Sequence, residues 1–428
     1  MELTLLGLAA VIFGAAAVAS WINATLFKLP IAVALLVLGM LASVMVMALD
    51  QLQPQLGAGR MFTAVVGQVD YPKLILRFML AYLLFAGAMN VDVGALGRRS
   101  LAAGVLATLG VVISAGVIGV CFWGIAGALG YDMPLTWAVV FGVIVSPTDP
   151  IAVLATVKRT TLERLLRSQI EGEALFNDGV AVVLFRAALA FALAHGAGHV
   201  DTLQIGGRVL IEALGGAGIG LAFSVVAVGF MRVVDDWGAE TLITIAVATG
   251  VYAVALALEV SGPIGVVCAG LVMGSRWSEK GMSDNTRRYL NPFWHLVDEN
   301  MNGIMFFLMG LQLYGLHFEP RYALVALAVV PVGLAARWIS VALPSAALLA
   351  TGRTVSLGLL SLLTWAGVRG GLSAAMALSL PDTPQKPVIL IATFSVAVFS
   401  IVVQSMTVEG LVVRTGYGQR RADPEPSY

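Results

Sequence analysis

The stretch Ser-Pro-Thr-Asp-Pro at 146–150 interrupts an apolar run that extends from 134 to 157. A run of this length crosses a bilayer, since about 20 apolar residues form one spanning helix. The two prolines break that helix and free the carbonyl groups of Val143 and Ser146. Non-helical backbone at membrane depth is tolerated only where it is buried in protein or lines a cavity. The stretch therefore predicts a membrane protein with a discontinuous helix beside a polar cavity.

The composition of the whole chain supports a membrane protein. Of 428 residues, 59% are apolar and 12% are charged, and the mean hydropathy is +0.92. These values exclude a soluble enzyme, a nucleic-acid binder and a disordered protein. The 25 basic and 25 acidic residues cancel, so no charged partner is indicated. Cys121 and Cys268 lie in apolar runs and predict neither a disulfide framework nor a metal site, and we expect no cofactor.

Apolar runs separated by charged or Pro/Gly-rich breaks predict an all-α membrane protein of about thirteen transmembrane helices. The expected cores are 3–21, 29–49, 74–91, 101–127, 134–157, 168–194, 206–231, 239–259, 262–277, 293–315, 321–349, 355–380 and 387–413. Residues 1–428 then form a single integral membrane domain that is embedded in the lipid bilayer. Residues 414–428 are expected to form a short cytoplasmic tail.

The distribution of basic residues predicts the orientation, because Lys and Arg accumulate in cytoplasmic loops. One set of connecting segments holds Lys28, Arg98, Arg99, Lys158, Arg159, Arg164, Arg167, Arg232, Arg276, Lys280, Arg287, Arg288 and Arg353, and the tail adds Arg414, Arg420 and Arg421. The opposite set holds only Arg60, Lys73, Arg321 and Lys386. This bias places the N-terminus outside and the C-terminus in the cytoplasm, in a bacterial-style plasma (inner) membrane.

Ionisable side chains inside spanning helices are costly, so each one is a functional candidate. They are Asp149, Glu171, Glu173, Asp178, Arg186, Arg337 and Arg369. Asp149 precedes a proline and also reads as the N-cap of a second half-helix. With the freed carbonyls, its carboxylate offers hard oxygen ligands to a small cation. The alternative interpretation is a proline kink with a capping aspartate.

The run 168–194 carries a second polar group. Asp178 lies about ten residues into this helix, near the middle of the bilayer. An unpaired carboxylate at that depth is expected to exchange a proton near neutral pH or to bind a cation. Glu173 and Asn177 are four residues apart and share a helix face, whereas Glu171 lies near the cytoplasmic end. The alternative interpretation of Asp178 is a structural, salt-bridged aspartate.

The run 355–380 contains Arg369 among three glycines, which predicts a second interrupted helix. A cation there offsets the negative C-terminal dipole of a half-helix; the alternative is a glycine packing face with a snorkelling arginine. Arg337 lies deep in its own run and needs a carboxylate partner. We expect Glu173 to be that partner, which leaves Asp178 free to titrate. Arg186 has no assigned partner and is expected to snorkel outward.

The two interrupted helices are the fifth and the twelfth of thirteen. Dividing the chain into a first repeat at 1–196, a linking helix at 206–231 and a second repeat at 239–413 places each break in the fifth helix of a six-helix repeat. The offset of seven helices inverts the second repeat. Discontinuous helices in corresponding positions of inverted repeats indicate the binding site of a transporter.

These motifs resemble those of the NhaP-like sodium/proton antiporters over nearly the whole chain. The most specific parts are 146–150 and Glu-Ala-Leu-Phe-Asn-Asp-Gly at 173–179. Val-Arg-Gly-Gly at 368–371, Leu-Phe-Ala-Gly-Ala at 84–88 and Phe-Leu-Met-Gly-Leu-Gln-Leu at 307–313 are also similar. The resemblance implies crossed half-helices, a homodimer, and a core domain that moves against the dimerisation domain.

The resemblance also implies roles for individual residues. Asp178 is expected to carry the ion and the proton, in a site shaped by Asn177, Asp149, Thr148 and Ser146. Glu173 and Arg337 correspond to the family's structural ion pair. Asn177 before Asp178, where other members have two aspartates, is the pattern associated with one-for-one electroneutral exchange.

Two positions depart from the pattern of some relatives. Ala86 stands where they carry an acidic residue, and Ala174 stands where they carry a serine. Either change removes a possible cation ligand, so the ion preference is open.

The expected activity is therefore exchange of Na⁺ or Li⁺ for H⁺ by competition at Asp178, with alternating access around a midplane site. A K⁺/H⁺ antiporter with the same mechanism is the main alternative. Two remote alternatives are a passive cation channel and an intramembrane aspartyl protease with Asp149 and Asp178 as its dyad. The protein is not expected to be an enzyme.

Overall fold

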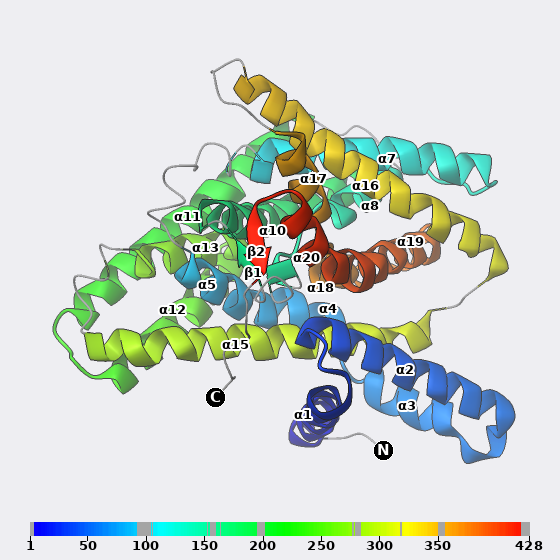
Figure 1. Cartoon of the computed structure of the whole chain (residues 1–428), viewed down its shortest axis with the longest axis horizontal. Coiled ribbons are helices and arrows are strands. Elements are labelled where there is room, and N and C mark those ends of the chain that lie inside the picture. The colour runs from blue at the N-terminus through cyan, green and yellow to red at the C-terminus, as the bar shows by residue number, and fades with distance from the viewer. Residues whose placement is uncertain are drawn as a thin grey trace.

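The computed structural model describes residues 4–91, 104, 106–151, 153–154, 160–162, 164–194, 202–275, 278, 284–316, 319–349 and 356–420. It is a bundle of long apolar helices (Figure 1). In the described ranges, nine helices are long and apolar enough to cross a membrane, and shorter apolar helices accompany them. The chain is therefore a multi-pass membrane protein.

Each of the thirteen predicted runs contains a described helix. The helices are α1 (Leu5–Ile22), α2 (Ile31–Leu52), α4 (Tyr71–Lys73) continuing into α5 (Leu80–Asn90), α7 (Val111–Ala128), α8 (Leu135–Val145), α10 (Arg164–Ala194), α11 (Thr202–Met231), α12 (Trp237–Ala257), α13 (Gly262–Met273), α15 (Asp284–Leu311), α16 (Pro320–Leu349), α17 (Leu357–Trp365) with α18 (Gly371–Leu378), and α19 (Lys386–Phe399) with α20 (Ser405–Arg414). The predicted all-α membrane architecture is confirmed.

The chain also contains short π-helical turns, which are η1 (Asn23–Phe27), η3 (Leu74–Met79), η4 (Leu106–Gly110) and η6 (Ser400–Gln404). Its short 3₁₀-helical turns are η2 (Pro54–Leu56) and η5 (Gln312–Gly315). Two of the π-helical turns, η3 and η6, lie within continuous helices, in the third and thirteenth spanning segments. They re-aim side chains without interrupting the span.

Three features differ from the sequence-based expectation. A short helix, α3 (Ala58–Val66), lies between α2 and α4. Two three-residue strands, β1 (Thr160–Leu162) and β2 (Gly418–Arg420), pair antiparallel. The helix α15 begins at Asp284 and continues through Pro292, where the sequence analysis had placed its start after the proline. Pro292 is the ninth residue of α15, so the helix continues through an interior proline with one backbone hydrogen bond lost.

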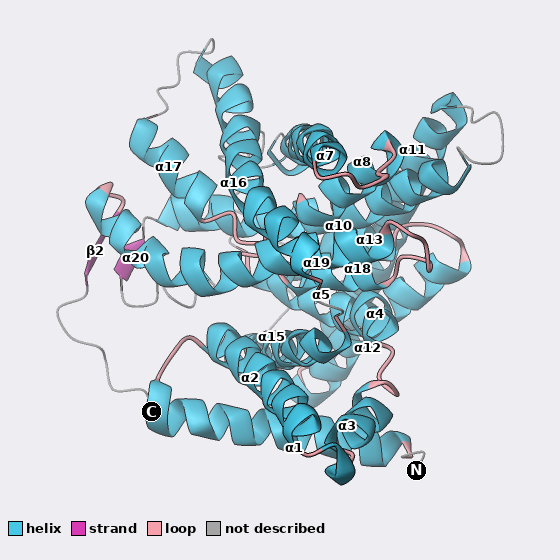
Figure 2. Cartoon of the chain, turned by 90° about the vertical axis from the view of Figure 1, so that its right-hand side faces the viewer, coloured by secondary structure: helices cyan, strands magenta, loops and turns pink. Residues whose placement is uncertain are grey.

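Three helices contact the helix seven positions later in the order of the spanning segments. α5 contacts α15, α7 contacts α16, and α8 contacts α18. The contacts of α2 with α15 and of α13 with α5 also exchange under this shift. Such a pattern is what a two-fold axis between two repeats produces. Figure 2 shows α5, α10, α18 and α19 near the centre of the bundle, with α1 to α3 at one side.

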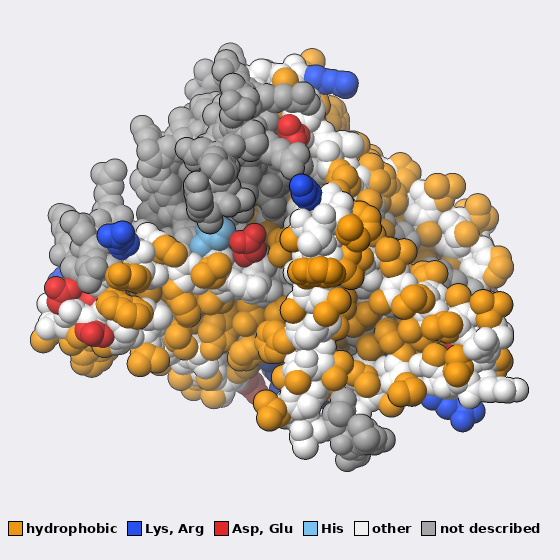
Figure 3. All heavy atoms as spheres, turned by 60° about the horizontal axis from the view of Figure 1, so that its bottom comes forward, with side chains coloured by type: hydrophobic (Ala, Val, Ile, Leu, Met, Phe, Trp, Pro, Cys, Tyr) orange, Lys and Arg blue, Asp and Glu red, His pale blue; other side chains and the backbone are white. Residues whose placement is uncertain are grey.

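The outer surface is strongly apolar. Leu210, Ile211 and Leu214 of α11, for example, are 63%, 67% and 71% exposed. Apolar side chains cover most of the described surface on the face in Figure 3, with few charged side chains among them. A large apolar surface of this kind is stable only against lipid or another apolar partner.

Several predicted cytoplasmic residues lie outside the described residues: Arg98, Arg99, Lys158, Arg159, Arg276, Lys280, Arg353 and Arg421, with the tail beyond Arg420. Among the described ones, Lys28 follows η1, Arg232 follows α11, and Arg414 ends α20. The orientation of the chain remains a prediction.

Candidate functional site

The two predicted helix breaks touch one another. α8 ends at Val145 and leaves 146–150 non-helical, and the chain between α17 and α18 is non-helical at 367–370. The backbone N–H of Asp149 donates to the carbonyl of Val368 at 2.7 Å. The prolines of one segment and the glycines of the other thus place two pieces of unwound backbone in direct contact.

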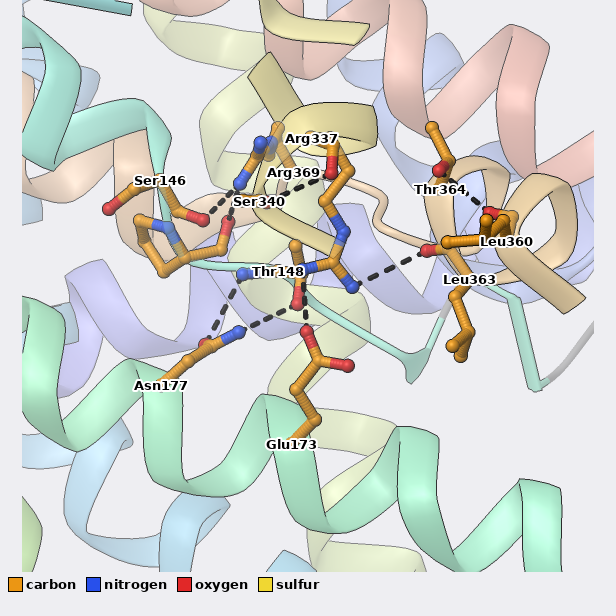
Figure 4. A network of polar contacts seen from close by, with 11 residues as sticks. Ser146, Thr148, Glu173, Asn177, Arg337, Ser340, Leu360, Leu363, Thr364 and Arg369 are labelled. Atoms are coloured by element: carbon orange, nitrogen blue, oxygen red, sulfur yellow. Dashed lines mark hydrogen bonds and ion pairs between the residues drawn. The ribbon is translucent and has the colours of Figure 1, made fainter. Parts of the chain in front are cut away.

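Arg369 caps the end of α8. Its Nη1 donates to the carbonyl of Ser146 and, at 3.1 Å, to that of Pro147 (Figure 4). The side chain is 2% exposed. Its positive charge therefore lies at the negative end of the half-helix dipole, as the sequence suggested.

Both carbonyl groups that the prolines free, those of Val143 and Ser146, accept hydrogen bonds from the protein. The Val143 carbonyl accepts hydrogen bonds from the hydroxyl of Ser146 at 3.0 Å and from its N–H at 3.3 Å. The Ser146 carbonyl accepts from Arg369. Protein donors thus bond to both of the carbonyls that the prolines released. The donor to the Ser146 carbonyl lies more than two hundred residues later in the chain, which the local sequence does not reveal.

Asn177 joins α10 to the break. Its Nδ2 donates to Oγ1 of Thr148 at 2.7 Å, and its Oδ1 accepts from the N–H of Thr148 at 3.3 Å (Figure 4). Both residues are buried. This two-point contact fixes the unwound segment against α10, one residue from Asp178.

Glu173 and Arg337 form a buried ion pair. Arg337 Nη1 lies 2.5 Å from Glu173 Oε1, and their side chains are 8% and 2% exposed. Arg337 Nη2 also donates to the carbonyl of Leu363, at 3.3 Å, near the end of α17. The structure therefore brings together the two residues that the sequence paired, and links α10 and α16 to the second broken helix.

Asp149 and Asp178 line one cavity of about 490 Å³. Both are partly buried. Asp149 Oδ1 accepts from the N–H of Ile151 at 2.9 Å, which is the capping contact expected from the sequence. Within the described part of the chain, the carboxylate of Asp178 has no hydrogen-bond or ion-pair partner. Asp178 is thus an acid on the cavity wall without a counter-charge among the described residues.

The cavity reaches solvent at its other end. Arg167 and His295 line it, and their side chains are 61% and 57% exposed. Arg167 pairs with Glu171 at 2.8 Å, which places Glu171 near the mouth. The two aspartates thus line a cavity whose walls also include these solvent-exposed side chains.

The cavity also has polar lining residues that were not predicted from the sequence. Asp298 and Asn302 of α15 and Ser373 of α18 line the same cavity. Asn302 Nδ2 donates to Oδ1 of Asp298 at 3.0 Å. The spacing of Asp298 and Asn302, four residues apart in an apolar run, was a signal that could have been found.

The structure also shows the surroundings of Arg186 and of the two alanines that depart from the family pattern. Arg186 pairs with Glu212 of α11 at 3.4 Å, so the expectation that it only snorkels was incomplete. Ala174 lines the cavity beside the two aspartates, whereas Ala86 is fully buried. Of the two departures from the family pattern, the alanine at 174 directly removes an oxygen from the cavity wall.

The sequence model of the transmembrane sodium/hydrogen exchanger domain matches residues 13–414. The chain belongs to the sodium/hydrogen exchanger family. It is 34% identical over 404 residues to the Na⁺/H⁺ antiporter NhaP of Pseudomonas aeruginosa, covering 94% of each chain. It is 35% identical over 297 residues to the Na⁺/H⁺ antiporter NhaH of Halobacillus aidingensis, covering 68% of this chain and 70% of the relative.

The fold is that of a solved member of this exchanger family. The sodium proton antiporter MjNhaP1 from Methanocaldococcus jannaschii at pH 8 superposes with a TM-score of 0.69 at 18% identity, over 97% of this chain and 99% of that one. The recognition of an NhaP-like chain from its motifs is thus confirmed.

Proposed function

We propose that this exchanger-family chain is a secondary active antiporter that exchanges Na⁺ or Li⁺ for H⁺, one for one. The observation that carries the proposal is the position of Asp178, a carboxylate that has no partner among the described residues and lines one cavity with Asp149, where two discontinuous helices meet. A proton and a cation compete for this carboxylate, so each displaces the other. Because only occupied forms cross the membrane, one gradient drives the other ion.

The surrounding residues take different roles in this proposal. Asp149 and Thr148 supply further oxygen atoms to the cation. Asn177 positions the break, and Ser146 acts through its carbonyl, which Arg369 holds. Glu173 and Arg337 form a structural pair that takes no part in ion binding.

The proposed topology follows from the cavity and the loops. Arg167 at the mouth belongs to the basic set of connecting segments, so the cavity opens to the cytoplasm, with the N-terminus outside and the C-terminus inside. Repeats at 1–196 and 239–413, joined by 206–231, then rock around the midplane site. We place the protein in the plasma (inner) membrane as a homodimer.

Purified protein in liposomes with an imposed pH gradient tests this function. Addition of Na⁺ or Li⁺ should dissipate the gradient, choline should not, and Asp178→Asn should abolish the response. Asp382→Asn is the matched control, because that carboxylate is 98% exposed. Coupled exchange in Asp178→Asn would refute the proposal.

The same preparation separates the rivals. Dissipation by K⁺ in place of Na⁺ would establish the K⁺/H⁺ alternative. A voltage-driven current carried by Na⁺ alone would indicate a passive channel.

A further inference from the structure

Ser373 is a buried hydroxyl without a partner at the wall of the ion cavity. It is 1% exposed, and it lines the cavity that holds Asp149 and Asp178. Within the part of the chain that the structure describes, its Oγ has no hydrogen-bond partner. An unsatisfied buried hydroxyl costs free energy, so a partner that is present for part of the working cycle is expected.

The helix break explains why this hydroxyl is free. Serine within a helix commonly donates to the carbonyl three or four residues earlier. Ser379, at the end of the same short helix, does so to Met376 at 2.7 Å. Ser373 is the third residue of α18, and the residues three and four positions before it, Gly370 and Arg369, lie in the unwound segment.

The position of Gly370 shows which way this part of α18 faces. A Cβ added to Gly370 would clash with Oδ2 of Asp149 and lie 2.6 Å from its Cβ. Gly370 therefore lies directly against the Asp149 carboxylate. Ser373 follows three residues later, as the third residue of α18, and lines the same cavity as Gly370 and Asp149.

We propose that the hydroxyl of Ser373 is a cation ligand supplied by the second repeat. The inference rests on the proposed antiport function and extends it, since Asp178, Asp149 and Thr148 all belong to the first repeat. Small hard cations prefer several oxygen ligands. Ala174 lacks the hydroxyl that some relatives carry on α10, and Ser373 offers one from α18 in the same cavity.

A neutral ligand affects the two transported ions differently. The hydroxyl oxygen stabilises a bound cation but does not bind the transported proton, which resides on a carboxylate. Removing this oxygen therefore lowers the affinity of the site for Na⁺ and leaves the proton affinity of Asp178 unchanged. The competition then shifts toward the proton, and a higher pH is needed for the same Na⁺ occupancy.

The test measures Na⁺-driven dissipation of a pH gradient in liposomes as a function of Na⁺ concentration and pH. Ser373→Ala should raise the Na⁺ concentration for half-maximal activity about five- to tenfold, as expected for one lost polar contact. At fixed Na⁺, the acidic limit of its pH profile should move to higher pH, with the maximal rate at saturating Na⁺ preserved. Ser379→Ala is the control, because its hydroxyl is already bonded within α18.

Two further variants distinguish the loss of a cation ligand from misfolding of the Ser373→Ala variant. Ser373→Cys keeps the volume but exchanges a hard oxygen for a soft sulfur, so affinity for Na⁺ should fall relative to affinity for Tl⁺. Ala174→Ser combined with Ser373→Ala should regain part of the lost Na⁺ affinity. Neither effect is expected from a purely structural serine.

The outcomes are distinct from failure of the antiport function itself. If the wild type shows no exchange that depends on Asp178, the proposed function fails. If the wild type exchanges and Ser373→Ala and Ser373→Cys match it in half-maximal Na⁺, ion preference and pH limit, the ligand assignment is wrong.

Discussion

Glu173→Gln should destabilise the protein far more than the loss of an ordinary surface charge. Glu173 neutralises Arg337 at 2.5 Å in a site where both side chains are almost fully buried. The charge of Arg369 also interacts with both residues. Removing the carboxylate leaves two buried cations near one another with their counter-charge gone.

The size of the effect follows from this burial. Breaking a buried ion pair by removing one partner costs about 3–5 kcal/mol, because the other charge is left uncompensated. For a chain of this size we expect a fall in Tm of about 5 °C. Arg337→Met should cost less, because the remaining Glu173 still interacts with Arg369 and can take up a proton. Removing both partners together should recover part of the loss.

Thermal unfolding of purified variants in one detergent checks this order. Glu212→Gln is the matched control, since it removes a carboxylate from an ion pair that is 49% and 25% exposed. That change should cost under about 1 kcal/mol. Two results would contradict this prediction: an equal Tm for Glu173→Gln and the wild type, or a lower Tm for Arg337→Met than for Glu173→Gln.

Three other predictions concern the site and its access. Asn177→Ala removes both hydrogen bonds to Thr148, so exchange in liposomes should fall at least about tenfold; unchanged exchange would show that the break needs no such support. Gly370→Ala places a methyl group against the Asp149 carboxylate and should abolish exchange, whereas Gly218→Ala, with nothing within 4 Å of the new atom, should match the wild type. In a background with Cys121 and Cys268 replaced, Asp298→Cys should react with a membrane-impermeant thiol reagent from the cytoplasmic side, and Glu259→Cys only from the opposite side. Reaction of Asp298→Cys from outside alone would reverse the proposed orientation.

The helix breaks were predictable because their causes are local. Pro147 and Pro150 remove donors wherever the chain is placed, and the glycines around Arg369 weaken any helix. The pairing of Glu173 with Arg337 could also be predicted, because a buried cation needs an anion and few were available.

Other parts of the site depend on contacts between distant segments. The carbonyl of Ser146 is taken by Arg369, more than two hundred residues later in the chain, and Arg186 finds Glu212 on the next helix. Ser373 reads as an ordinary helical serine until the packing places it at the cavity wall. The sequence therefore predicted which residues carry charge, but not which oxygen atoms remain free to bind an ion.

The central claim is that a cation and a proton compete for the carboxylate of Asp178. The most direct measurement is proton release when Na⁺ is added to purified protein in weakly buffered detergent solution. The wild type should release one proton for each Na⁺ bound, and Asp178→Asn should release none, while Asp382→Asn behaves as the wild type. Equal proton release from Asp178→Asn and the wild type would contradict the account.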